Sequence, residues 1–183
     1  MFQRIHIFGA SGSGTTTLAR ALASELGYFH FDTDDIYWLP SQEPFTLKRE
    51  IPERQEIIKE LISRHPSWVW SGSMCGWGDM FIPYIELAVF LWIPEEERIR
   101  RLLAREASRY GKEIEPGGGR HEAHQVFIDW ASRYDRGGME IRSRTLHEAW
   151  LSELRCPVLR LEGDGRESVG GKVDRVLAAI REL

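Results

Sequence analysis

A glycine-rich loop near the amino terminus constrains the fold of this 183-residue chain more than any other feature of its sequence. The loop spans residues 9–16 and reads GASGSGTT. Residues 4–8 before it are mostly apolar, which is typical of a buried parallel β-strand. After it, leucine recurs every four positions from Leu18 to Leu26, and Gly27 ends this helical pattern. A glycine-rich turn between a strand and a helix predicts an α/β protein.

The glycine spacing predicts that the loop binds phosphate. The Walker A pattern is G-x-x-x-x-G-K-[ST], and Gly9, Gly14 and Thr16 match it, whereas Thr15 replaces the lysine. Glycine backbone can wrap closely around a phosphate, and the N-terminus of the following helix adds partial positive charge. The Thr16 hydroxyl is a candidate ligand for Mg²⁺.

We therefore expect the loop and the first helical turn to bind a nucleotide through Gly9, Ser11, Gly12, Ser13, Gly14, Thr15, Thr16 and Thr17. The alternative is a glycine-rich turn that binds no ligand.

The rest of the chain alternates between strand and helix patterns. Further strands are predicted at 28–31, 68–70, 87–93 and 157–161, and helices near 52–62, 95–110, 126–134, 146–154 and 173–180. This alternation predicts a doubly wound parallel sheet with right-handed crossovers.

Composition narrows the class of protein. The length fits one domain, and the net charge of -4 provides no basic footprint for nucleic acid. No apolar run approaches the roughly 20 residues that a membrane span needs. Cys75 and Cys156 are too far apart for metal-type spacing, so we expect reduced thiols. We therefore expect a cytoplasmic protein without nucleic-acid or membrane partners; the sequence does not distinguish a monomer from a homodimer.

The loop, the acidic end of the second strand and the arginine-rich helix after the fourth strand together resemble the nucleoside-monophosphate kinase and shikimate kinase group. Archaeal cytidylate kinases in this group also carry a G-S-G-T-T-T loop without lysine, as residues 12–17 do here. The resemblance implies a five-stranded parallel sheet in the order 2-3-1-4-5, flanked by helices, with a helical lid. It further implies one domain over 1–183, an acceptor-binding segment at about 35–66 and a lid at about 106–145.

Three aspartates, Asp32, Asp34 and Asp35, follow the second strand at the sheet edge where α/β proteins bind ligands. By resemblance to shikimate kinases, Asp32 would help to hold Mg²⁺ and Asp34 would bind the acceptor hydroxyl. The alternative is that Asp34 or Asp35 caps a short helix.

The third strand ends in Ser71-Gly72-Ser73, where nucleotide kinases usually have Asp-Gly followed by an arginine. The missing arginine argues against a nucleoside monophosphate as the acceptor. Gly72 and Ser73 are candidates for binding a small anion or hydroxyl. Arg54, and less so Arg49, are candidates for an acceptor carboxylate or phosphate; the alternative for both is a solvated helix charge.

Arginines recur every three or four residues on the helix after the fourth strand, at Arg98, Arg101, Arg105 and Arg109. Residues 101–105 fit the R-L-x-x-R pattern that opens the lid of adenylate-kinase-like enzymes. Phosphoryl transfer depends on cationic stabilisation, so Arg105 and Arg109 are the candidate catalytic arginines, with Arg142 and Arg144 as further candidates. The alternative is that these arginines form a basic, solvated face of the helix. In either case, we expect Leu103 to be among the inward-facing positions.

These features together favour a kinase that uses ATP and Mg²⁺ to phosphorylate a small metabolite or nucleotide. The resemblance also implies that the loop 163–165 lies near the base of the nucleotide. Two other classes stay open: a nucleotide-binding regulator, and an NTP hydrolase without a small-molecule acceptor.

Overall fold

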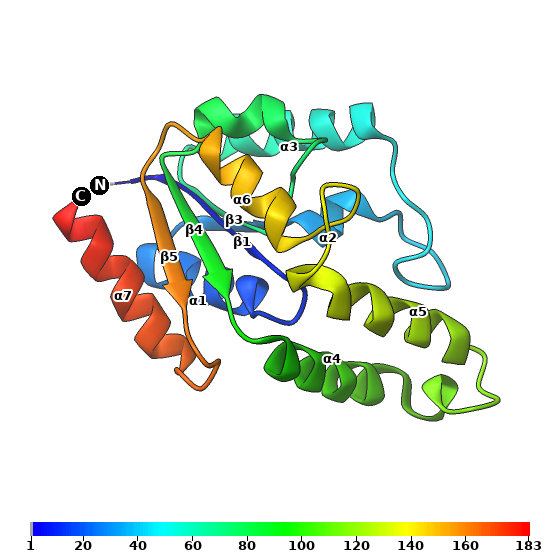
Figure 1. Ribbon diagram of the computed structural model, residues 1–183. Helices are drawn as coiled ribbons and strands as arrows, with labels where there is room; N and C mark the ends of the chain where they lie inside the picture. Colours follow the sequence, from blue (N-terminus) through cyan, green and yellow to red (C-terminus); the bar gives the residue numbers. More distant parts are fainter. Residues whose placement is uncertain (1) are drawn as a thin grey trace.

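The computed structural model describes residues 2–183 and is built around a five-stranded parallel sheet (Figure 1). The strands are β1 (Arg4–Gly9), β2 (Phe29–Asp32), β3 (Trp68–Ser71), β4 (Leu87–Trp92) and β5 (Val158–Glu162). Their spatial order is β2-β3-β1-β4-β5, and every neighbouring pair is parallel. The predicted fold class and strand order are therefore confirmed.

Helices connect the strands as the alternating pattern predicts. They are α1 (Thr15–Leu26), α2 (Thr33–Tyr37), α3 (Ile51–Arg64), α4 (Glu95–Tyr110), α5 (His121–Ser132), α6 (Arg144–Ser152) and α7 (Val169–Glu182), with 3-10 turns η1 (Asp79–Tyr84), η2 (Gly111–Ile114) and η3 (Arg133–Asp135). The sequence indicates the short helix α2 only as an alternative for the acidic segment, because five residues are too few to show a helical period. Between residues 2 and 183, no helix has both the length and the apolar character needed to cross a membrane.

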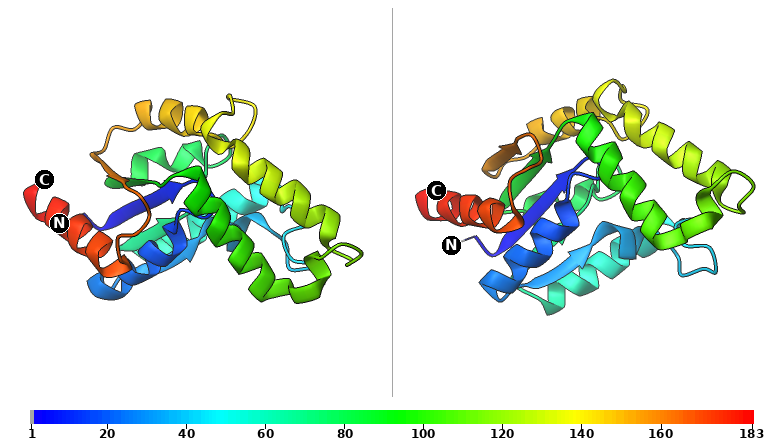
Figure 2. Two further views of the ribbon diagram at one scale, coloured as in Figure 1. Left: turned by 60° about the horizontal axis from the view of Figure 1, so that its bottom comes forward. Right: turned by 90° about the horizontal axis from the view of Figure 1, so that it is seen from below.

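Both faces of the sheet are covered, so its central strands are buried. Helices α1 and α7 cover one face, and α3, α6 and η1 cover the other (Figures 1 and 2). Along β1, Ile5 and Ile7 pack toward α1 and α7, whereas His6 and Phe8 pack against aromatic rings on the opposite face. This two-sided burial explains why β1 reads as a nearly continuous apolar run.

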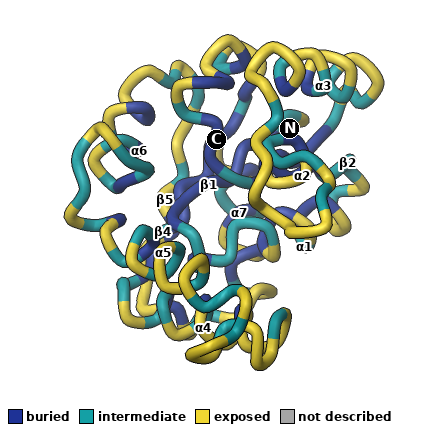
Figure 3. The backbone as a smooth tube through the Cα atoms, turned by 90° about the vertical axis from the view of Figure 1, so that its right-hand side faces the viewer, coloured by how far each residue is buried: buried dark blue, intermediate teal, exposed yellow. Residues whose placement is uncertain are grey.

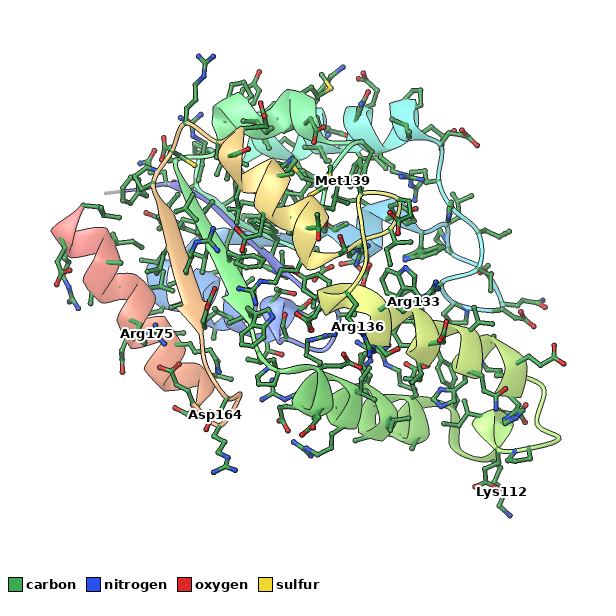
Figure 4. The ribbon with its side chains drawn as sticks, viewed as in Figure 1. Lys112, Arg133, Arg136, Met139, Asp164 and Arg175 are labelled. Carbon is green, nitrogen blue, oxygen red and sulfur yellow. The ribbon has the colours of Figure 1, made fainter. Side chains whose placement is uncertain are left out.

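Helices α4 and α5 form a hairpin that extends beyond the carboxyl ends of the strands (Figure 2). Lys112, in η2, lies at its tip, far from the sheet (Figure 4). Figure 3 shows exposed positions on α4 and on other outer helices and loops, whereas the central strand β1 is mostly buried. The carboxyl ends of the strands and the hairpin therefore lie on the same side of the molecule.

The expectation that the arginines of α4 form a single basic stripe is wrong for Arg98, which lies buried at the base of the hairpin. Its side chain has no exposed surface, and its Nη2 donates to Asp135 Oδ2 at 2.6 Å. Trp92 Nε1 donates to the other oxygen of the same carboxylate at 2.7 Å. Arg98 therefore anchors α4 to η3. Leu103, expected to face inward, is 44% exposed, because α4 packs along a narrow face only.

Candidate active site

The glycine loop is held closely against the sheet and α4. A Cβ added at Gly9 would lie 2.2 Å from the Leu91 carbonyl oxygen, and one at Gly12 would lie 2.7 Å from that of Arg98. Gly14 has φ 98° at the N-cap of α1, and no side chain among residues 2–183 caps that helix. The first amide groups of α1 are thus free to bind an anion, and the loop fits a phosphate group.

Asp32 joins the loop to the acidic segment after β2. Its buried carboxylate accepts hydrogen bonds from the Thr16 hydroxyl at 2.7 Å, the Ser71 hydroxyl at 2.5 Å and the Asp34 amide at 2.9 Å. Asp32 and Ser71 are register partners in the parallel pair β2–β3, so their side chains meet at the carboxyl edge. The N-cap of α2 is Asp32, so the alternative in which Asp34 or Asp35 caps a short helix is wrong.

The Thr16 and Asp32 oxygens suit a hard cation. Mg²⁺ at nucleotide sites takes one or two protein ligands, and the remaining positions go to phosphates and water. Within the described chain, no three His, Cys, Asp or Glu side chains are grouped closely enough to hold a metal by themselves. The donor set therefore fits a cation that binds together with a nucleotide.

Asp34 on α2 and Arg105 on α4 belong to one group of charged side chains. Both residues are exposed by surface area, yet the surrounding protein raises the pKa of Asp34 and lowers that of Arg105, chiefly by desolvation. The charges of Arg105 and Arg142 also act on Asp34, and Arg142 lies 5.3 Å over the Trp130 ring. We call Asp34, Arg105 and Arg142 the charged cluster, which combines one carboxylate with two guanidinium groups.

Arg54 is not a solvated helix charge. It is 6% exposed, and its Nε donates to the Arg49 carbonyl at 2.6 Å. Its guanidinium carbon lies 3.8 Å from the centre of the Tyr37 ring and 5.4 Å from that of Trp77. This packing fixes the guanidinium beside the segment that follows β2.

The turn after β3 also has a constrained geometry. Gly72 has φ 96°, and a Cβ there would lie 2.6 Å from Cβ of Thr33. Ser73 is buried, and its hydroxyl lies 3.0 Å from Nε2 of His147 on α6. The turn is thus fixed from two sides.

Two cations beside the glycine loop were not among the predicted site residues. Arg101 Nη2 donates to the Gly165 carbonyl at 2.5 Å, and its Nη1 lies 3.5 Å from the Ser13 carbonyl. Lys172 on α7 is buried, and its Nζ donates to the Glu167 carbonyl at 2.7 Å. The R-L-x-x-R pattern includes Arg101, so the sequence could have identified this residue as a site candidate. Lys172 belongs to no motif, so the sequence could not have identified it.

Arg101 and Lys172 border a cavity of about 180 Å³ next to the loop. Its other walls come from the loop, α1 and the start of α7: Ser13, Gly14, Thr17, Leu18, Glu167 and Val169. A larger cavity of about 520 Å³ lies near Gln3, Arg4 and Trp68, at the amino ends of the strands. The carboxyl edge carries the charged and loop groups, so the smaller cavity is the one relevant to chemistry.

Comparison with known families agrees with this geometry. A family described as AAA domain (AAA_18) matches residues 5–126, which include the glycine loop, the acidic segment and α4. The chain belongs to this family. The YqaC protein of Bacillus subtilis, described as uncharacterized, is 50% identical over 177 residues, covering 97% of each chain. A cytidylate kinase of Archaeoglobus fulgidus is 30% identical over 122 residues, 61% of this chain and 64% of that protein.

Solved structures show the same fold. The shikimate kinase of Bacteroides thetaiotaomicron superposes with a TM-score of 0.59 at 18% identity, covering 99% of both chains. The family match, the cytidylate kinase relative and this architecture confirm the expected resemblance to the nucleoside-monophosphate kinase and shikimate kinase-like group of P-loop proteins. At a coarse level this resemblance supports phosphoryl transfer.

Proposed function

We propose that the protein is a kinase that transfers a phosphoryl group from ATP, with Mg²⁺, to a small hydroxylated or phosphorylated acceptor. The observation that supports the proposal most is a pair of hydrogen bonds that joins the glycine loop to the segment after β2. The Thr16 hydroxyl donates to the Asp32 carboxylate, and the same carboxylate accepts a hydrogen bond from the backbone amide of Asp34, whose charge interacts with those of Arg105 and Arg142. A phosphate at the loop and an acceptor at the charged cluster would meet at these groups.

The donor end would use the loop amides for the phosphates. Thr16 and Asp32 would hold Mg²⁺, which when bound neutralises phosphate charge. Arg101 and Lys172 would contact the rest of the nucleotide in the cavity beside Gly14. The two cations add positive charge beside a loop in which Thr15 replaces the usual lysine.

The acceptor end would use residues that differ in chemistry. Asp34 would accept a hydrogen bond from the acceptor hydroxyl and direct its oxygen toward the γ-phosphorus. Arg54, with Gly72 and Ser73, would bind an anionic or hydroxyl group of the acceptor. Arg105 and Arg109 would stabilise the transferred group, since transition-state charge lies on its equatorial oxygens.

We also propose one domain, with an acceptor-binding segment at about 35–66 and a lid at about 106–145. The hairpin of α4 and α5 would close over the charged cluster, and this closure would exclude water from the reacting groups. Support comes from Arg109, whose guanidinium lies 5.7 Å from the centre of the Phe45 ring on the acceptor segment.

The test is ADP release from ATP and Mg²⁺ against a panel of nucleoside monophosphates, hydroxylated carboxylic acids and sugars. A kinase releases ADP only when its acceptor is present. If ADP is released at the same rate whether or not an acceptor is present, the protein is an NTP hydrolase. If nucleotide binds but no ADP is released, the protein is a regulator. Asp34→Asn is the matched variant, because it removes the acceptor carboxylate while leaving the loop intact.

A further inference from the structure

A chain of buried hydrogen bonds joins the turn after β3 to the base of the hairpin. Ser73 Oγ lies 3.0 Å from His147 Nε2, and His147 Nδ1 lies 2.8 Å from the Tyr134 hydroxyl. The side chains are 6%, 0% and 2% exposed, respectively. They come from three separate parts of the sequence: the turn after β3, α6 and η3. The proposed catalytic steps above make no use of His147 or Tyr134.

The donor and acceptor in each hydrogen bond can be assigned from the protonation of the His147 ring and the partners available to the Tyr134 hydroxyl. Burial, then the charge of Arg142, lowers the pKa of His147 to about 3, so its ring is neutral and carries one N–H. Within residues 2–183, the Tyr134 hydroxyl has His147 Nδ1 as its hydrogen-bond partner and no other. A buried phenol proton without an acceptor is costly. Tyr134 therefore donates to Nδ1, and the ring proton is on Nε2.

This tautomer determines what the Ser73 hydroxyl can do. The Nε2–H donates to Ser73 Oγ, so the single proton of Ser73 remains for another acceptor. Burial raises the pKa of the nearby Cys75 thiol to about 11, and the Ser73 side chain acts in the opposite direction. A thiol sulfur is a weak hydrogen-bond acceptor, so an oxygen of a bound ligand would be the stronger partner for the Ser73 proton.

We propose that Tyr134 and His147 are positioning residues that turn the Ser73 hydroxyl toward the bound acceptor, so that Ser73 donates to an anionic oxygen of it. The proposal rests on the proposed function and narrows the acceptor to one with a carboxylate or phosphate group. The positive charge of Arg142 acts on Asp34, Cys75 and His147. An anionic oxygen beside Ser73 would therefore also meet a cation.

A double-mutant cycle tests the positioning role. Ser73→Ala and Tyr134→Phe should each raise the KM for the acceptor by about five- to tenfold, the loss of one hydrogen bond, with the KM for ATP unchanged. In the Ser73→Ala background, Tyr134→Phe should add nothing, because the hydroxyl that it positions is gone. Additive effects would mean that Tyr134 only supports the fold, and the proposal fails. Tyr28→Phe is the matched control, since it removes a remote hydroxyl bonded to the Phe2 carbonyl.

A second measurement does not depend on the acceptor. In ¹⁵N NMR spectra of the imidazole groups, with the His147 signal assigned from His147→Gln, wild type should show His147 protonated at Nε2. Tyr134→Phe should give a mixture of tautomers. Protonation at Nδ1 in wild type overturns the hydrogen-bond chain. Absence of turnover with every acceptor would contradict the proposed function, and with it the proposed contact between Ser73 and the acceptor. The His147 tautomer tests the hydrogen-bond chain independently of turnover.

Discussion

The Thr16 hydroxyl donates a 2.7 Å hydrogen bond to the Asp32 carboxylate, joining the first turn of α1 to the carboxyl end of β2. The strand order places β3 between β1 and β2, and Ser71 at the end of β3 donates to the same carboxylate oxygen. Nucleotide kinases usually have aspartate near this position of the third strand. Here a serine supports the neighbouring aspartate instead, so the negative charge is concentrated on Asp32.

Asp32→Asn should weaken the use of Mg²⁺ more than the binding of nucleotide. Loss of a metal-supporting carboxylate typically costs 10–100-fold in metal affinity, and we expect about a tenfold rise in the Mg²⁺ concentration for half-maximal turnover. Asparagine is also a good N-cap, so α2 should persist. Magnesium titrations at fixed ATP measure the shift. Asp34→Asn is the comparison, since it should chiefly raise the acceptor KM; equal, small effects of both would contradict the metal role.

Arg105→Ala should lower turnover by a factor on the order of 10³, the low end of arginine-finger effects, with far less change in nucleotide affinity. Thr15→Lys in this background should restore part of the activity, because it returns the charge that the loop lacks. Steady-state rates with a confirmed acceptor measure both effects. Arg100→Ala on the same helix is the control, since Arg100 is exposed and paired with Glu97. A near-wild-type rate for Arg105→Ala would contradict the role of Arg105 in stabilising the transferred group.

Lys172→Met should weaken ATP binding by about tenfold, the cost of one hydrogen bond to a charged group. Methionine keeps the length and apolar stem of the buried side chain while removing the ammonium. Isothermal titration with ATP and Mg²⁺ measures the affinity. Arg175→Met is the matched control: Arg175 lies on the same helix (Figure 4), and its ion pair with Glu167 is half exposed. Equal affinities of the Lys172 variant and wild type would exclude contact with the nucleotide.

The stability of the protein should depend on His6 in mildly acidic solution. His6 is fully buried among rings that include Phe8 and Trp150, and burial lowers its pKa from 6.5 to about 3. Between those values the unfolded chain binds a proton that the folded protein does not, so stability is present above pH 6.5 and is lost as the pH falls. The loss from His6 is about 1.4 kcal/mol per pH unit.

His6→Leu should remove this dependence. Urea unfolding at pH 8 and pH 5 should show that wild type loses about 2 kcal/mol more than the variant between the two values. His147, whose pKa is lowered in the same direction, acts in both proteins and leaves a residual slope. Identical losses in the two proteins would show that His6 does not stay neutral in the folded state.

The features that could be predicted from the sequence depend on local signals. Helix α1 ends at Gly27, which adopts φ 68° as its C-cap, and the buried strand β1 shows its apolar pattern directly. The features that could not be predicted depend on partners far apart in the chain. Arg98 is buried because Asp135, 37 residues away, accepts its hydrogen bond. Likewise, Ser73 and His147 are separated by 74 residues, and no motif predicts the contact between them.

In the proposed reaction, the γ-phosphoryl group of ATP passes to an acceptor bound at the charged cluster. The most direct measurement is turnover of ATP in ¹⁸O-labelled water with the acceptor found in the panel. The account predicts one phosphorylated acceptor for each ADP, with no ¹⁸O in the transferred group, and less of this product from Asp34→Asn at a subsaturating acceptor concentration. Formation of ¹⁸O-labelled inorganic phosphate at the same rate with and without acceptor would contradict it.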